Sequence, residues 1–168
     1  MDDAPDRGES RAPQLQDVLD LCQALNREGA RYVLIGGFAV ILHGFVRSTK
    51  DVDLLVDPSE ENIRAVKRAM STLPDNAAAL LADNEVLEYQ VVRVADEIVV
   101  DLLAAACGVT YSETSKSEIE TFRVHGVEIP VASKEILIRM KDTIRESDAM
   151  DVRFLHMRIE EDEKKRRR

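Results

Sequence analysis

The sequence is poor in the features that mark secreted, membrane-spanning and zinc-stabilised proteins. Its two cysteines, Cys22 and Cys107, lie far apart and form no CxxC pair, which argues against a structural zinc site. The longest apolar run, Val33–Leu42, contains two glycines. It has about half the ~20 residues that a membrane span needs. The first residues are acidic and polar, unlike a secretory signal. We therefore expect a cytoplasmic protein with no membrane partner.

Basic residues are in the minority: 32 Asp and Glu face 23 Lys and Arg, and the net charge is -9. Phosphate contacts need Lys and Arg, so this balance argues against a general DNA- or RNA-binding protein. It does not exclude a local basic patch.

The 168 residues and the hydrophobic fraction of 45% fit one globular domain. We expect a disordered tail over residues 1–13, a domain over 14–160 and a charged tail over 161–168.

Hydrophobic periodicity predicts alternating helices and strands. Helices are expected over 14–28, Phe38–Leu42, 59–73, Lys134–Glu146 and Ser147–Glu160. Strands are expected over Arg31–Ile35, Asp51–Val56, Val86–Val94, Ile98–Leu103, Thr121–Val124 and Val127–Val131. Residues 74–84 and 108–118 are expected to be irregular connections. Together these elements predict an α/β (α+β) domain with a mixed sheet of roughly four to six strands flanked by helices.

Two aspartates alternate with a valine in an otherwise apolar strand. Side chains two apart on a strand share a face, so the carboxylates of Asp51 and Asp53 point the same way. Two like charges ~4 Å apart repel by about 4 kcal/mol at an effective dielectric constant near ~20. A divalent cation would relieve this repulsion, because aligned carboxylate oxygens are good ligands for it. The alternative is a solvent-facing cluster of ion pairs with Arg47 and Lys50.

Two further features accompany this pair. Gly36 and Gly37 follow a strand and open a helix, where a backbone without Cβ atoms can approach a phosphate; the alternative is a plain turn. Asp101 interrupts the apolar strand Ile98–Leu103, where a charge must be paired or coordinating. Alone, it also fits a strand-end aspartate that meets a Lys or Arg. Combined with the first pair, these features predict three carboxylates for magnesium (or manganese) beside a cradle for a nucleoside triphosphate.

These residues resemble the nucleotidyltransferase superfamily, whose fold is shared by DNA polymerase beta. The family pattern is hG[GS], a spacer and Dh[DE]h, followed by a third carboxylate on a later strand. Ile35–Gly37 matches the first part and Asp51–Leu54 matches the second. Asp101 is the candidate for the third carboxylate.

The sequence from Gly36 to Asp53 looks most like that of the AbiEii-type branch, which includes toxins of toxin–antitoxin pairs. That branch also carries a lysine and an Arg-x-x-Asp-x-x-Asp helix start, which are matched here by Lys141, Arg145, Asp148 and Asp151. The resemblance covers roughly residues 30–155. We expect no counterpart of the larger helical domain of many such toxins, and Gly37 stands where the family pattern also allows serine.

The resemblance implies a role for each matched residue. Asp51 and Asp53 would bind two magnesium ions, and Asp101 would complete the shell of the ion beside the acceptor hydroxyl. The residues implied for phosphate or nucleotide binding are Gly36, Gly37, Arg47, Lys50 and Lys141. For Arg47 and Lys50 the alternative is a solvated loop, and for Lys141 it is a polar helix face.

The implied activity is transfer of a nucleoside monophosphate from an NTP to a hydroxyl, with release of pyrophosphate. The acceptor is an RNA 3′ end, a protein side chain or a small molecule such as an aminoglycoside, and the sequence does not choose among them. A cognate toxin or antitoxin protein is an implied partner. The alternative function is a non-catalytic nucleotide-binding or protein-interaction module that retains the fold.

Overall fold

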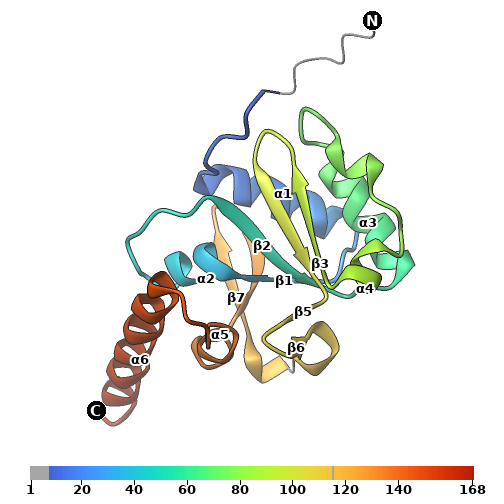
Figure 1. Ribbon diagram of the computed structural model, residues 1–168. Coiled ribbons are helices and arrows are strands. Elements are labelled where there is room, and N and C mark those ends of the chain that lie inside the picture. Colours follow the sequence, from blue (N-terminus) through green and yellow to red (C-terminus); the bar gives the residue numbers. More distant parts are fainter. Residues whose placement is uncertain (1–7, 115) are drawn as a thin grey trace, which may run out of the picture.

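The computed structural model of the chain describes residues 8–114 and 116–168. Within these residues, the larger sheet has six strands in the order β3-β4-β2-β1-β8-β7 (Figure 1). They are β1 (Tyr32–Ile35), β2 (Asp51–Val56), β3 (Val91–Ala95), β4 (Val99–Leu103), β7 (Ile119–Val124) and β8 (Val127–Ala132). A separate ribbon pairs β5 (Ala105–Ala106) with β6 (Val109–Thr110).

The sheet is mixed, which confirms the predicted fold class. β1 runs antiparallel to β2 and parallel to β8. β2 runs parallel to β4, and antiparallel pairs join β3 to β4 and β7 to β8. The central strand β1 is buried along its whole length, as its continuous apolar sequence requires. In β2, by contrast, the two aspartates share one face, while Val52 and Leu54 enter the core on the other.

Two groups of helices enclose this sheet (Figure 1). The helices are α1 (Leu15–Arg27), α2 (Gly36–Leu42), α3 (Glu60–Met70), α4 (Glu85–Tyr89), α5 (Lys134–Met140) and α6 (Glu146–Arg166). α1 packs against α3 and β8, whereas α5 packs against α6 and α2. The Ser59 and Ser133 hydroxyls cap α3 and α5 by accepting hydrogen bonds from backbone N–H groups of the first turn.

Two predicted elements are wrong in detail. The segment expected as one strand over Val86–Val94 begins as the short helix α4, and the strand starts only at Val91. Gln90 separates the two with a φ of 65°, a reversal that short apolar runs do not reveal. The helix expected over Lys134–Glu146 ends at Met140, and a turn precedes α6.

The two ends of the chain also differ from expectation. Residues 1–7 of the expected tail lie outside the described residues, but Ser10 and Arg11 bind the turn between β3 and β4. The Ser10 hydroxyl donates to the Asp96 carbonyl (2.6 Å), and the Arg11 N–H donates to the Glu97 carbonyl (2.8 Å). At the other end, α6 continues to Arg166 instead of stopping near residue 160. Acidic residues one turn before basic ones, with the basic ones at the helix C-terminus, stabilise this extension.

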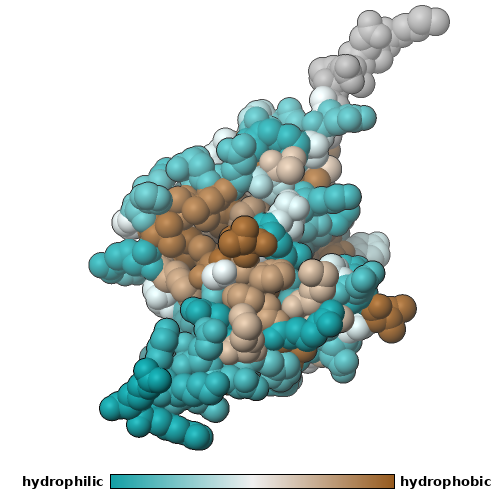
Figure 2. Space-filling model, turned by 90° about the vertical axis from the view of Figure 1, so that its left-hand side faces the viewer, coloured by the Kyte–Doolittle hydropathy of each residue, from teal (hydrophilic) through white to brown (hydrophobic). Residues whose placement is uncertain are grey.

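Two side chains with reactive groups, Cys22 and His43, pack in the core. Cys22 is buried in α1, and His43 is buried with its Nε2 2.9 Å from the Ala132 carbonyl. No helix among the described residues has the length and apolarity that a bilayer crossing requires. The side of the molecule that carries α2 and α6 shows an apolar area bordered by hydrophilic residues (Figure 2). Val46, in the loop after α2, and Met150, in α6, are exposed apolar residues.

Candidate active site

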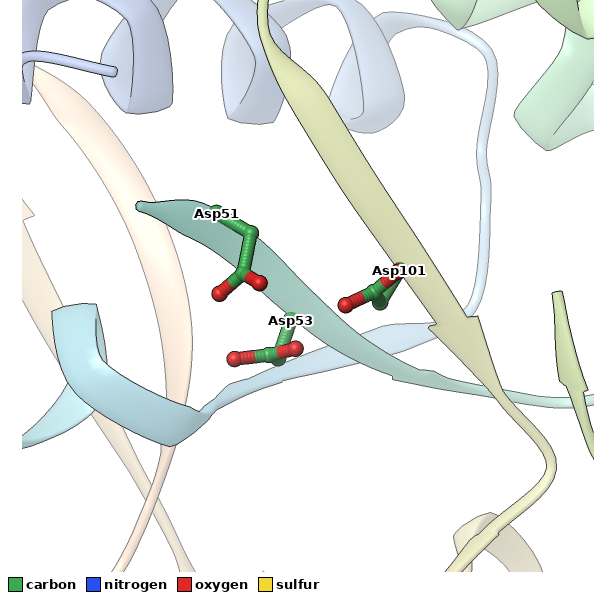
Figure 3. Close-up of side chains that lie close together, drawn as sticks. All are labelled: Asp51, Asp53 and Asp101. Atoms are coloured by element: carbon green, nitrogen blue, oxygen red, sulfur yellow. The ribbon is translucent and has the colours of Figure 1, made fainter. Parts of the chain in front are cut away.

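Three carboxylates from two neighbouring strands point toward one another (Figure 3). Asp51 and Asp53 lie on β2, and Asp101 lies on β4, directly across from Asp53 in the parallel pairing. One oxygen from each of the three lies within 4.8 Å of the others. We call this cluster the triad. The structure thus brings together the three residues that the sequence pattern grouped.

The triad is partly withdrawn from water and strongly like-charged. Burial raises the pKa of Asp53 to about 7, and the charges of Asp51 and Asp101 add to the effect. The pKa of Asp51 is also raised, mainly by burial and secondarily by repulsion from Asp101. Two carboxylates with raised pKa values beside a third carboxylate form a site that a divalent cation would stabilise.

Arg93 is the main residue at this site that the sequence interpretation missed. It lies on β3 across from Asp101. Its Nε and Nη2 donate to the two oxygens of Asp101, both at 2.9 Å, and Nη2 also donates to Asp51 at 3.1 Å. The hydrogen bonds to Asp101 raise the pKa of the guanidinium further. The sequence does signal Arg93, because a charged residue interrupts the valine-rich run Val91–Val94. Its partner could not be predicted, because that partner depends on the register in which β3 pairs with β4.

The glycine turn has close neighbours of its own. Gly36 has a φ of 70°, and a Cβ there would lie 2.1 Å from Oδ2 of Asp53. A Cβ on Gly37 would lie 2.6 Å from Oγ1 of Thr49 and 2.9 Å from a guanidinium nitrogen of Arg47. Both glycines therefore allow side chains of the site to approach the start of α2 closely. This packing accounts for them without a ligand, and phosphate binding by the turn stays a prediction.

Arg47 and Lys141, whose predicted role is phosphate or nucleotide binding, also take part in a second charged cluster. Asp151 of α6 is fully buried, with Oδ1 3.4 Å from Nε of Arg47 and Oδ2 2.8 Å from Nζ of Lys141. Lys141 also lies 3.4 Å from Asp148. We call these four residues the Asp151 cluster. Neither Asp151 oxygen accepts an aligned hydrogen bond from the described residues, so these contacts are ion pairs rather than hydrogen bonds.

Two hollows adjoin the triad. The apolar hollow, of about 480 Å³, is lined by Gly36, Asp53 and apolar side chains that include Val91, Leu103 and Met140. Lys141 and Arg145 also line it.

The charged hollow, of about 510 Å³, is lined by Asp51, Lys50, Arg93, Arg11, Ser10, Ala12 and Val99. Lys50 is exposed there and forms no ion pair within the described part of the chain. The triad thus has an apolar space on the Asp53 side and a polar, charged space on the Asp51 side.

Comparison with known proteins supports the architecture. No family model matches the sequence, and no curated protein matches it significantly. Among solved structures, the lincosamide antibiotic adenylyltransferase LnuA in its lincomycin-bound form is similar, with a TM-score of 0.57 and 15% identity, over 87% of this chain and 98% of that one. A candidate nucleotidyltransferase from Thermotoga maritima has a TM-score of 0.49 and 18% identity, over 91% and 90% of the two chains.

At these identities the likeness is one of fold. It does not address the AbiEii-type branch, which stays a prediction. The six-stranded mixed sheet, the helices around it and the similarity to LnuA lead to one conclusion: the chain has the nucleotidyltransferase fold.

Proposed function

We propose that the chain is a metal-dependent nucleotidyltransferase that moves a nucleoside monophosphate from an NTP to a hydroxyl. The observation that carries this proposal is the triad, in which three carboxylates converge with their oxygens within 4.8 Å. Such repulsion between like charges serves no structural purpose that the fold requires, since neutral polar residues would fit the same strand positions. It is accounted for if a cation binds there.

The donor set of the triad suits magnesium or manganese. Its members are Asp51, Asp53 and Asp101, which offer only oxygen atoms, and hard divalent cations prefer oxygen ligands. Bound there, the metal would supply charge stabilisation to the phosphoryl oxygens during transfer. Asp53 must ionise to serve as a ligand, and its raised pKa of about 7 makes that ionisation coupled to metal binding.

The apolar hollow is the better place for the nucleotide. It adjoins Asp53 and the turn at Gly36, both of which line it. Its apolar lining suits the faces of a nucleobase. Lys141 and Arg145, which also line it, bring positive charge toward a triphosphate.

In the proposed reaction the acceptor oxygen bonds to the α-phosphorus and the bond to the bridging α–β oxygen breaks. Pyrophosphate leaves with that oxygen, and the proton of the hydroxyl passes to water. The acceptor is an RNA end, a protein side chain or a small molecule. LnuA, the adenylyltransferase with the similar fold, is bound to the small molecule lincomycin, and this makes a small acceptor one of the cases to test. A toxin–antitoxin setting is a further part of the proposal and rests on the sequence resemblance alone.

Thermal unfolding in the presence of magnesium or manganese and each of four NTPs tests the binding half of the proposal. We expect a rise in melting temperature, because a ligand at ~100 times its dissociation constant stabilises the folded state by about 2.7 kcal/mol. The double variant Asp51→Asn/Asp53→Asn should lose the shift. The control Glu60→Gln/Glu61→Gln, with the same charge change at exposed residues of α3, should keep it. A parent protein with no shift under any of these conditions contradicts the proposal.

A radiolabelled NTP assay with magnesium against whole-cell RNA, protein and small-molecule extracts tests the catalytic half. Transfer of label with release of pyrophosphate is expected from the parent and not from the double variant. Binding without transfer to any fraction would instead support the non-catalytic alternative.

A further inference from the structure

The triad divides the space around it in a way that separates the two substrates. Asp53 and Gly36 line the apolar hollow, whereas Asp51 and Arg93 line the charged hollow. In an in-line displacement, the entering and leaving oxygens lie on opposite sides of the phosphorus. If the nucleotide occupies the apolar hollow, as the proposed function has it, the acceptor must approach from the charged hollow.

Positive groups dominate the lining of the charged hollow, in a protein whose net charge is -9. They are Arg11, Lys50 and Arg93, and Asp51 is the acidic residue among the lining side chains. Arg11 already bridges Asp17 (2.7 Å) and Glu97 (3.2 Å), so its charge is compensated and it serves as a fixed wall. Lys50 has no such partner among the described residues, and its charge is available to a ligand.

Ion pairs hold only the guanidinium end of Arg93, and most of the side chain is exposed. Its side chain is 62% exposed, and its guanidinium fork is occupied by Asp101 and Asp51. Arg93 contacts both oxygens of Asp101, so a cation bound by that carboxylate would compete with Arg93 for at least one of them. We expect this competition to free part of the guanidinium, which lines the charged hollow. A freed guanidinium fork matches the geometry of two phosphate oxygens.

We infer that the charged hollow is an acceptor site, in which Lys50 and Arg93 bind a phosphate group that the acceptor carries near its reacting hydroxyl. This inference rests on the proposed function. It disfavours a polycationic acceptor such as an aminoglycoside, which these two side chains would repel. The phosphate could belong to the end of an RNA strand or to a mononucleotide, and the binding chemistry is the same.

The test is binding of a short fluorescent oligoribonucleotide to the full chain with magnesium and a saturating, non-hydrolysable NTP analogue. Lys50→Ala and Arg93→Gln should each weaken binding about 5–10-fold and lower the steepness of its salt dependence by about 0.7, the value for one lost phosphate contact on a single strand. Lys165→Ala, an exposed lysine at the far end of α6, is the matched control and should change neither. Competition with AMP and with an aminoglycoside, both unlabelled, identifies the source of the phosphate.

If AMP displaces the oligoribonucleotide at a similar concentration of phosphate groups, the site accepts any phosphorylated acceptor. If neither AMP nor the aminoglycoside displaces it, the site is specific for the end of an RNA strand. Either result supports the inference. It is overturned if the aminoglycoside competes best, or if Lys50→Ala binds RNA as the parent does while the magnesium–NTP thermal shift is intact. Loss of that shift in the parent marks failure of the proposed function itself, and the inference then fails with it.

A second readout concerns Arg93 without any nucleotide. If Arg93 competes with the metal for the triad, Arg93→Gln should bind magnesium several-fold more tightly than the parent in calorimetry. Weaker magnesium binding in this variant would show that Arg93 is not displaced and cannot turn to a phosphate.

Discussion

The triad and the Asp151 cluster are both built from aspartates and basic side chains, yet their charge balance is opposite. In the triad, three carboxylates share one guanidinium that is mostly exposed. In the Asp151 cluster, a fully buried carboxylate lies between Arg47 and Lys141, and Asp148 brings the count to two negative and two positive groups. The first cluster lacks positive charge, whereas the second is complete.

This difference indicates what each cluster is for. A balanced, buried cluster needs nothing from outside and holds α6 against the loop after α2 and the end of α5. An unbalanced cluster beside two hollows is consistent with the cation site proposed above. The sequence motifs did not reveal the ion pairs of Arg47 and Lys141 with Asp151, because a motif shows which residue types are present and not which partners they contact.

The largest expected effect tests the structural side of this comparison. Asp151→Ala removes the one carboxylate between two cations and leaves both with reduced charge compensation in a poorly hydrated place. We expect the free energy of unfolding in urea to fall by about 3–5 kcal/mol, as for other broken buried ion pairs. Asp142→Ala, an exposed aspartate in the turn before α6, should change it little. A loss no larger than that of the control would mean that the Asp151 cluster does not hold α6.

The second effect tests the triad as a catalytic rather than a merely binding site. Asp101→Asn keeps the shape of the side chain and removes one charge on the side away from Gly36. Transfer in a single turnover should fall at least ~100-fold, or about 2.7 kcal/mol, while magnesium–NTP affinity stays within a few-fold of the parent. Asp20→Asn on the exposed face of α1 is the control. Equal losses in affinity and rate would instead make Asp101 part of the nucleotide site or of the fold.

The third and smallest effect uses the pH dependence of stability to test the repulsion within the triad. The pKa of Asp53 is about 7 in the folded protein against an ordinary 3.8, so between these values the folded state holds a proton that the unfolded chain has lost. Without metal, this group therefore favours folding at low pH, and its contribution is lost as the pH rises through about 7. Asp53→Asn removes the titration.

Near pH 4, Asp53→Asn and the parent should have the same free energy of unfolding. At pH 8 the free energy of unfolding of Asp53→Asn should exceed that of the parent by on the order of 2 kcal/mol, after a discount for partial hydration. Urea unfolding at both pH values, in a chelating buffer, measures this. Asp142→Asn should show no such gain. A gain that does not depend on pH would mean that Asp53 is not the titrating group.

Much of the fold follows from the sequence because hydrophobic period and glycine placement are local signals. The strand over Asp51–Val56 and the shared face of its two aspartates are set by alternation alone. The helix at Glu85–Tyr89 was missed because four or five residues with mixed polarity fit a strand equally well, and tertiary packing of Val86 decides between them.

The partners of charged residues could not be predicted in the same way. Arg93 reaches Asp101 only because β3 pairs with β4 in one particular register. Asp151 reaches Arg47 across roughly a hundred residues of chain, through the packing of α6. Both contacts depend on where whole elements dock, and no short pattern of residues encodes that.

The place of Asp151 in the chain also bears on the order of events during synthesis. A ribosome makes β2 and β4, and with them the whole triad, before it adds α6. A nascent chain that stops short of Glu146 carries every acidic ligand of the candidate site and still leaves Arg47 and Lys141 without their shared partner. Completion of the last helix therefore supplies the buried carboxylate that compensates these two cations.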